Sequence, residues 1–345
     1  MDKVTRVGID LAKKVFHVTA VDADGVVLER KRLRRAGLQS YLACLPRGCA
    51  VAMEACGGAH HWSRVAAGYG HRVSLMSPQF VAPYVKSNKN DVNDADAIAE
   101  ASARPSMRFV GMKSVEQEQI QQLHRARQMA MRNRVAQSNQ IHGFLLEYGI
   151  EAPRGTAALL RRLAEVLEDA ENELPMDARS LLRELGDEVR RQNERVGMFE
   201  AQLRAAAQRM PACQRLIGIP GVGMLTATAL VASVGDAGEF RNGRELAAWL
   251  GMVPRQYSTG GRSRLLGISK RGDRYLRFLF IQGAKSAVRT AARRSDRRSR
   301  WVVEVEQRRG TNIAAVALAN KNARTAWAIL RRETSFDAGH LPKAA

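Results

Sequence analysis

The stretch KSNKNDVNDADAIAE, residues 86–100, places three aspartates where a polar segment becomes a predicted helix. Asp91 and Asp94 are three residues apart, so they share one face of that helix, about a turn from each other. Two neighbouring carboxylates repel each other, and a divalent cation held by oxygen ligands removes that cost. The same residues also suit an ordinary helix start, where Asn and Asp cap the helix and acids favour its dipole.

The distribution of charge indicates a polyanionic partner. The 345-residue chain has a formal net charge of +21 and a pI of about 10.7. Residues 255–332 contain 20 Lys and Arg against 4 Asp and Glu, a net charge of +16. The basic excess therefore belongs to the C-terminal part, which is typical of a nucleic-acid contact rather than of general solubility.

Cysteine usage and hydropathy exclude two other classes of protein. The four cysteines form no C-x-x-C pair, so a zinc ribbon is not predicted, and their small number fits a reducing compartment. No apolar run approaches the length of a membrane span, and the N-terminus lacks the apolar part of a signal peptide. We therefore expect a cytoplasmic protein that does not enter a membrane.

Residues 1–104 are predicted to form an α/β domain in which three strands make a meander and helices then alternate with strands. The expected strands are 4–10, 15–21, 26–33, 50–53 and 72–75, and the expected helices are 38–45, 60–67 and 91–103. Asp10 ends the first strand and Glu54 follows the fourth. We expect these two acids to gather with Asp91 and Asp94 at one sheet edge. Such a cluster can hold two Mg²⁺ ions on a phosphodiester.

This pattern resembles the ribonuclease-H-like, RuvC-like domain of the DEDD transposases of bacterial insertion sequences. The resemblance runs through VGIDLAKKVF at Asp10, AMEACGGAHHW at Glu54, and KNDVNDADAIA at Asp91 and Asp94. Each motif is weak alone, but the three together have the order and spacing of the family. The resemblance implies that these four acids are catalytic and hold Mg²⁺.

Five polar residues near these motifs have two interpretations each. Asp96 lies about 200° around the helix from Asp94, so it would not bind the metal directly. It would instead support the metal ligands from outside or be solvated. His60 and His61 could contact a phosphate or a ligand carboxylate, or be surface residues. Lys13 and Lys14 could reach a backbone phosphate or be solvated.

Residues 105–212 are predicted to be a helical, coiled-coil linker and oligomerisation region. Residues 114–148 suit one long helix. A heptad seam with one polar position then follows: Leu182, Leu185, Val189, Gln192, Val196, Phe199, Leu203 and Ala206. Three heptads suit a hairpin within one chain as well as a coiled coil between chains. The resemblance favours a homo-oligomer, a dimer or tetramer, because such transposases act as multimers on two DNA partners.

Residues 213–332 are predicted to form a helical domain with a helix–hairpin–helix-like motif. In CQRLIGIPGVGMLTATALVASV, residues 213–234, a Gly-rich turn separates two helices. Gly221 and Gly223 would let this turn approach a DNA phosphate, and the second helix offers free N–H groups at its start. The alternative is a plain turn between packed helices.

The basic excess is concentrated after this motif. Residues 255–272 are predicted to be a polar loop, and residues 274–292 a helix. The candidates for binding nucleic acid in these two segments are Arg262, Arg264, Lys270, Arg271, Arg274 and Arg277. The run RRSDRRSR, residues 293–300, is a solvated face or a nucleic-acid contact, and its basic neighbours favour the contact. Residues 312–332 suit a closing helix, and the tail 333–345 is expected to be disordered.

The segment from GIPGVG through YSTGGRSRLLGISKRGDRYLR resembles the C-terminal domain of the same family, so the resemblance covers nearly the whole chain. It implies a serine nucleophile in the loop after LGMVP, here Ser258. Because the family often has Ser directly before Gly, the intervening Thr259 is the alternative. The resemblance also implies a phosphoserine–DNA intermediate, and a guide RNA encoded by the element that pairs with donor and target DNA.

Three functions fit these residues. The first is a Mg²⁺-dependent DNA transposase, or site-specific recombinase, that uses the four acids and Ser258 near the bacterial nucleoid. The second is a hydrolytic RuvC-like junction nuclease, whose cleavage would survive the loss of Ser258. The third is a nucleic-acid-binding protein with an inactive RuvC-like domain. All four acids stand at their motif positions, which argues against the third, and we favour the first.

Overall fold

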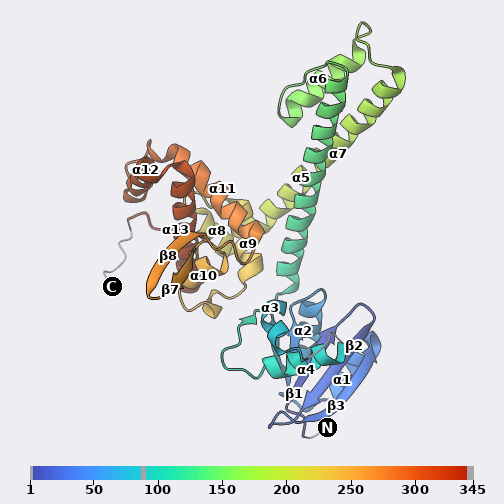
Figure 1. The fold of residues 1–345 in the computed structure, drawn as a ribbon, viewed down its shortest axis with the longest axis vertical. Coiled ribbons are helices and arrows are strands. Elements are labelled where there is room, and N and C mark those ends of the chain that lie inside the picture. Colours follow the sequence, from blue (N-terminus) through green and yellow to red (C-terminus); the bar gives the residue numbers. More distant parts are fainter. Residues whose placement is uncertain (1–2, 87–90, 340–345) are drawn as a thin grey trace. The chain divides into compact units, whose positions relative to one another are not determined.

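The structure is a computed structural model that describes residues 3–86 and 91–339. It divides into two compact units between Ser114 and Val115 (Figure 1). The N-terminal unit combines a sheet with helices, and the C-terminal unit is helical apart from one hairpin. None of the described helices is long and apolar enough to cross a membrane.

The N-terminal unit contains a six-stranded mixed sheet in the order β3-β2-β1-β4-β5-β6. The strands are β1 (Arg6–Leu11), β2 (Val15–Val21), β3 (Val27–Arg34), β4 (Ala50–Glu54), β5 (Arg72–Met76) and β6 (Phe109–Val110). The meander β1–β2–β3 is antiparallel, and β1, β4 and β5 are parallel neighbours. The predicted mixed α/β domain is therefore confirmed, with the short β6 added antiparallel to β5.

Helices cover both faces of this sheet. They are α1 (Arg35–Cys44), α2 (Ala59–Gly68), α3 (Pro78–Val81), the 3-10 turn η1 (Ala82–Tyr84) and α4 (Asp91–Ala101). On one face, Val7, Ile9 and Met53 share an apolar cluster with side chains of α1 and α2. On the other, Ala52 shares a cluster with Ile98 of α4. Successive strand residues alternate between faces, so β1 and β4 divide the unit into a layer with α1 and α2 and a layer with α4.

Gly8 lets α4 lie directly on β1. A Cβ atom at this position would lie 2.4 Å from Ala95 O and 2.5 Å from Ala99 N, both backbone atoms of α4. Any side chain larger than hydrogen would therefore push the helix away from the strand.

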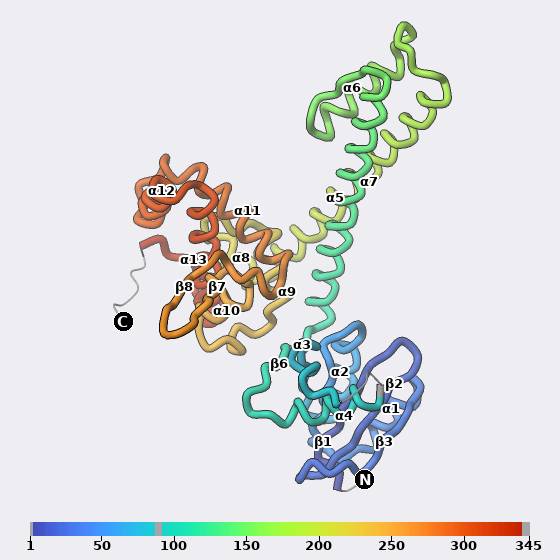
Figure 2. Tube along the Cα trace, in the orientation of Figure 1, coloured from blue at the N-terminus to red at the C-terminus, as the bar shows by residue number. Residues whose placement is uncertain are grey.

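The C-terminal unit begins with two long antiparallel helices that Figure 2 shows side by side. They are α5 (Val115–Glu147) and α7 (Met176–Arg209), with α6 (Thr156–Glu168) between them in sequence. Leu182 and Val189 of the heptad seam are buried in a cluster with Ile141 of α5, and Leu203 is buried with Ile120 of α5. The seam is thus filled from within the chain. The arrangement within this chain is the intramolecular hairpin, and the association of several chains stays a prediction.

The remaining helices surround one apolar core. They are α8 (Pro211–Ile217), α9 (Met224–Val234), η2 (Ala237–Glu239), α10 (Gly243–Trp249), α11 (Arg274–Ala291), α12 (Arg297–Arg309) and α13 (Thr311–Arg332). His124 of α5 is tied to this core: its Nδ1 lies 2.9 Å from Tyr275 Oη and its Nε2 3.0 Å from Thr228 Oγ1. Burial, and then the charge of Arg127, lower the pKa of His124 to about 4, so the ring is neutral near pH 7.

Two segments differ from the sequence-based expectation. The predicted loop 255–272 contains an antiparallel hairpin, β7 (Pro254–Thr259) and β8 (Arg262–Ile268), closed by two glycines with positive φ. Nearly all of its residues are exposed on both faces, so no two-residue alternation marked the strands. Of the tail that was expected to be disordered, residues 333–339 are described and Phe336 packs against the C-terminal core, whereas residues 340–345 lie outside the described residues.

Candidate active site

The sheet brings two of the predicted acids together. β1 and β4 are parallel neighbours, and their register pairs Ile9 with Met53, the residues just before Asp10 and Glu54. Burial, and then the negative charges of Glu54 and Asp10, raise the pKa of Cys56. Both carboxylates therefore lie near the same thiol at the carboxyl ends of these strands.

The strand alternation also gives the side of the sheet on which these acids stand. Gly8 is directly against α4, and Ala52 shares an apolar cluster with α4. Asp10 and Glu54 each follow one of these residues by two positions, so they belong to the same face of the sheet. The helix with the remaining two predicted acids covers that face.

The contribution of α4 itself is described only in part. Asp94 is half-buried on this helix, whereas the side chain of Asp91 lies outside the described part of the structure. Among the side chains that are described, no three of the types His, Cys, Asp and Glu are close enough to hold a metal ion. The structure thus brings together Asp10 and Glu54, and the complete set of four stays a prediction.

Asp96 holds α4 to the meander. Arg30 donates to both carboxylate oxygens of Asp96, from Nη2 at 2.8 Å and from Nε at 3.1 Å, and Thr19 Oγ1 donates at 2.7 Å. Burial alone would raise the pKa of Asp96, but these hydrogen bonds and the charge of Arg30 hold it below its ordinary value. Asp96 is therefore an ionised carboxylate that joins α4 to β2 and β3.

The structure also shows the surroundings of the two histidines and two lysines for which the sequence left two interpretations. His60 Nδ1 accepts a hydrogen bond of 3.3 Å from the backbone N of Lys113, whereas His61 is exposed with its ring edge-on to Trp62. Lys13 and Lys14 are exposed just beyond β1. These lysines remain available to a phosphate, while His60 already contacts the backbone.

Two residues beside the acids were missed from the sequence. The β1–β2 register pairs His17 with Asp10, and Cys56 lies near both Asp10 and Glu54. Cys56 could have been noticed because it follows Glu54 by two positions. His17 could not, because its relation to Asp10 depends on the strand register.

Ser258 lies on the exposed strand β7 of the hairpin. Gln256 Nε2 donates to Ser258 Oγ at 2.8 Å and to Ser263 Oγ at 3.2 Å, and Ser258 pairs with Ser263 across the two strands. The amide would stabilise negative charge on the Ser258 oxygen and leaves the hydroxyl hydrogen available. Thr259 is equally exposed, so exposure does not separate the two candidate nucleophiles.

Comparison with known proteins identifies the family. A model described as transposase of the IS116/IS110/IS902 family matches residues 213–300, and a second transposase model matches residues 7–150. The chain is 49% identical to a probable family 20 transposase of Pseudomonas aeruginosa, over 97% of this chain and 99% of that protein. The chain belongs to the IS116/IS110/IS902 transposase family. The resemblance inferred from the acidic and glycine-rich motifs is confirmed.

Other relatives align with this transposase from end to end. The transposase for insertion sequence element IS1111A of Coxiella burnetii is 45% identical over 98% of this chain and 93% of its own length. The transposase for insertion sequence element IS1328 of Yersinia enterocolitica is 45% identical over 97% and 99% of the two chains. The similarity therefore extends over nearly the whole length of both units.

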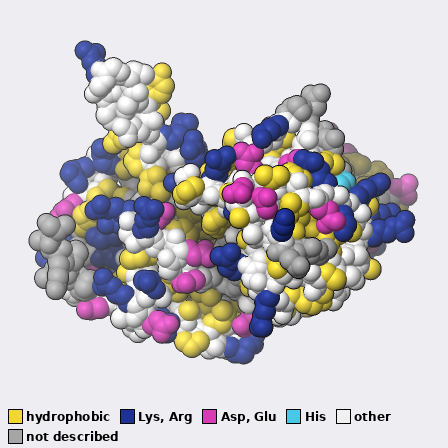
Figure 3. All heavy atoms as spheres, turned by 90° about the horizontal axis from the view of Figure 1, so that it is seen from below, with side chains coloured by type: hydrophobic (Ala, Val, Ile, Leu, Met, Phe, Trp, Pro, Cys, Tyr) yellow, Lys and Arg dark blue, Asp and Glu magenta, His cyan; other side chains and the backbone are white. Residues whose placement is uncertain are grey.

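The predicted basic surface of the transposase is exposed, with one exception. The exposed residues are Arg262, Arg264, Lys270, Arg271 and Arg274. Figure 3 shows that Lys and Arg side chains are spread over one face of the molecule. These residues remain candidates for phosphate contacts.

Arg277 is the exception, and it fixes the base of the serine hairpin. Its side chain is buried, with the residue only 9% exposed, and Nη1 donates to Leu250 O at 3.1 Å and to Arg271 O at 2.9 Å. Gly251 adds to this contact, since a Cβ there would lie 2.1 Å from Arg271 O. Nη1 of Arg277 is therefore occupied by backbone carbonyls on either side of the hairpin, a role that we did not predict, and a phosphate contact of Arg277 stays a prediction.

Arg277→Met should loosen the hairpin base without unfolding the helical core. It leaves the carbonyls of Leu250 and Arg271 without this donor, at a cost of about 1–3 kcal/mol for a buried group. Arg274→Met, on the exposed side of the same helix, is the matched control. Hydrogen exchange should quicken at the amides of Ser269 and Lys270 in Arg277→Met only. Equal exchange in the two variants would contradict this role.

The two helices predicted on either side of the Gly-rich turn are present as α8 and α9. Gly221 has a positive φ of 86°, and a Cβ there would lie 2.8 Å from Gly283 O of α11. This glycine therefore serves a backbone contact with α11, which differs from the phosphate approach that we predicted for it. Gly223 has open space beside it, so a DNA contact by the turn stays a prediction at that residue.

Proposed function

We propose that this transposase cuts and rejoins the DNA strands of an insertion sequence, with Asp10, Glu54, Asp91 and Asp94 holding Mg²⁺ and Ser258 as the nucleophile. The observation that carries the proposal is the position of Asp10 and Glu54 on neighbouring parallel strands that face α4. An antiparallel meander joined to parallel strands also supports a ribonuclease-H-like, RuvC-like assignment of the sheet.

The acids present suit a hard divalent cation. Asp10 and Glu54 supply carboxylate oxygens from two strands, and α4 carries the other two acids over the same face. Mg²⁺ prefers such oxygen ligands. Two bound ions would stabilise the charge on the attacking and leaving oxygens of a phosphodiester.

The serine chemistry keeps the energy of the broken phosphodiester bond in a phosphoserine bond, so that the strand can be rejoined. Ser258 Oγ would form a bond to phosphorus and lose its proton to a base, while one DNA end leaves as a free hydroxyl that takes up a proton. A hydroxyl of another DNA end would then attack the phosphoserine and release Ser258. The hydrogen bond from Gln256 supports this role because it stabilises the developing charge on Oγ.

The partners of the reaction follow from the family and from the charge. Donor and target DNA, and a guide RNA encoded by the element, are the partners that the family resemblance favours. The exposed arginines and lysines of the C-terminal unit suit phosphate contacts without base readout. A dimer or tetramer would associate through surfaces other than the α7 seam, since α5 fills that seam.

A trap for covalent protein–DNA adducts tests the proposal. Transposase co-expressed with the RNA from the flanks of its element is mixed with donor and target DNA and Mg²⁺, denatured and separated on a gel. An adduct should form with the wild type and vanish in Ser258→Ala. It should persist in Ser263→Ala, the matched control from the paired position on β8.

Two other results would correct the assignment. Loss of the adduct only in Thr259→Ala would make Thr259 the nucleophile. Free cut ends without any adduct, at equal yield in Ser258→Ala, would instead show a hydrolytic junction nuclease and refute the serine mechanism.

A further inference from the structure

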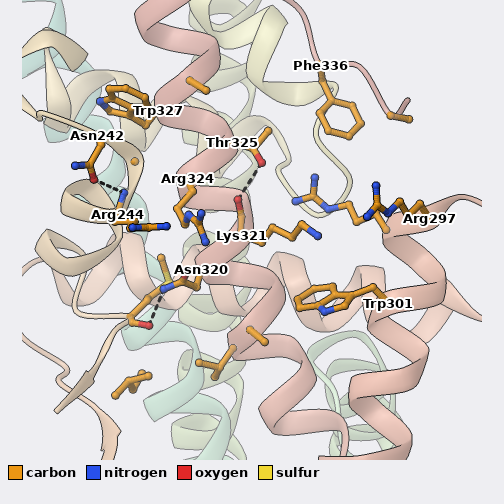
Figure 4. Close-up of a pocket in the computed structure, with 18 of the residues that line it drawn as sticks. Asn242, Arg244, Arg297, Trp301, Asn320, Lys321, Arg324, Thr325, Trp327 and Phe336 are labelled. Carbon is orange, nitrogen blue, oxygen red and sulfur yellow. Dashed lines mark hydrogen bonds between the residues drawn. The ribbon is translucent and has the colours of Figure 1, made fainter. Parts of the chain in front are cut away.

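The C-terminal unit contains a cavity of about 1090 Å³ that the catalytic proposal does not use (Figure 4). Residues of α10, α12, α13 and the tail after α13 line it, together with Pro254 of β7 and Ile268 of β8 at the base of the serine hairpin. Its cationic lining residues are Arg244, Arg297, Arg298, Lys321 and Arg324, and Asp337 is the acid among the lining residues. A wall with five cations and one carboxylate favours an anionic ligand.

The cations of this cavity are close enough to repel one another. Burial, and then the charges of Arg298, Arg297 and Arg324, lower the pKa of Lys321. In Figure 4 Lys321 extends toward Arg297 and Trp301, and its Nζ lies 4.3 Å from the centre of the Trp301 ring. Within residues 3–86 and 91–339, none of the five cations forms an ion pair, and the nearby charge of Asp296 offsets only part of the effect of burial on the pKa of Arg298.

Arg298 has unused hydrogen-bonding capacity at the same place. Its Nη2 donates to Asn322 Oδ1, and its guanidinium lies over the Phe336 ring. Its Nε is buried without a hydrogen-bond partner in the described structure. Burial lowers the pKa of Arg298 to about 10, which shows how strongly this cation is desolvated. An anion that accepts from Arg298 would compensate both the missing hydrogen bond and the lost hydration.

We propose that this cavity binds the phosphates of a single nucleic-acid strand. Several converging cations suit phosphate groups, and arginine is well shaped to bind them. Lys321 and Arg297 lie together in Figure 4, and Arg244 and Arg324 lie together elsewhere along α13, so successive phosphates can be held. The inference is independent of the serine mechanism.

The shape of the cavity selects a single strand over a duplex. The cavity is concave and has an apolar part that includes Trp301 and Phe336. An unstacked base can enter such a space and contact aromatic side chains, as in other single-strand sites. The phosphates of a duplex lie on a convex cylinder with the bases stacked inside. A duplex would therefore contact only the rim of the cavity and would not enter it.

Fluorescence anisotropy with the full-length protein tests this site. The probes are a labelled single-stranded DNA, the RNA of the same sequence and the duplex DNA. The double substitution Arg297→Gln with Lys321→Gln should weaken binding of a single strand about tenfold and lower the slope of log K against log [salt] by about 1.4. The matched control is Arg195→Gln with Arg204→Gln, two exposed arginines of α7, and its affinity should stay within about twofold.

The outcomes separate the ligands and the causes. A loss with DNA, with RNA or with both supports the site and identifies the strand. An unchanged affinity, or a loss equal to that of the α7 control, overturns the proposal, and so does a larger loss for the duplex than for either single strand. Because Arg297 is exposed, the single substitution Arg297→Gln should leave the fold intact. It should weaken binding about threefold, which separates a loss of binding from a loss of folding. The measured quantity is equilibrium binding, which does not require the nucleophile, so this test is separate from that of the serine mechanism.

Discussion

Asp10→Asn should lower the rate of DNA strand cleavage by more than about 10³-fold while the sheet stays folded. The neutral amide cannot replace an anionic oxygen ligand, and Asp10 stands beside Glu54 on the face covered by α4. The sheet should still fold, because asparagine has nearly the same size as aspartate at this position of β1. Cleavage of labelled DNA in Mg²⁺, with a thermal melt of the same sample, measures both effects.

Asp96→Asn is the matched control, because it makes the same chemical change on the helix that covers the site. It weakens the tie to Arg30 and Thr19, and we expect a loss of about 1 kcal/mol of stability after allowing for solvent screening. Its cleavage rate should remain within about tenfold of the wild type. Cleavage that survives Asp10→Asn but fails in Asp96→Asn would exchange the roles that we give to these two acids.

Gly8→Ala should destabilise the N-terminal unit by about 3 kcal/mol. The new methyl group would lie 2.4 Å from Ala95 O and 2.5 Å from Ala99 N, and backbone atoms of a helix cannot move aside as a side chain can. The substitution should shift α4 away from β1, and cleavage should fall with it. Hydrogen exchange at the amides of α4 measures the loss of stability directly.

Gly57→Ala is the control for this prediction, because nothing lies within 4 Å of the position that its Cβ would take. It should leave the exchange of the α4 amides unchanged. If Gly8→Ala protected those amides as well as Gly57→Ala does, the close approach of α4 to β1 would be refuted.

Periodic and strand-ending residues made much of the N-terminal unit predictable. Val15–Val21 was expected as a strand and is one, because β-branched residues and flanking polar residues mark both of its ends. The acids at positions 10 and 54 were expected at one sheet edge, and Asp10 is the penultimate residue of β1 while Glu54 is the last residue of its parallel neighbour β4. Both inferences start from local patterns, and such patterns can be recognised in one sequence without knowledge of tertiary contacts.

Other features depend on partners that the sequence does not name. The heptad seam showed that α7 needs an apolar neighbour, but α5 of the same chain or a second chain would fill it equally well. Arg277 was expected to be available to phosphates because it lies in a basic segment, whereas its Nη1 donates inside the protein to the carbonyls of Leu250 and Arg271. The hairpin at 254–268 was missed because strands exposed on both faces carry no alternating pattern.

The anchored but exposed hairpin has an evolutionary consequence. Its base is fixed by Arg277, while Ser258 and its neighbours along β7 bury nothing in the core. Substitutions along this strand therefore carry little penalty for folding, and selection can act on them almost entirely through the reaction. Such a segment can acquire a new preference for its substrate in a few single steps, each of which leaves a folded transposase.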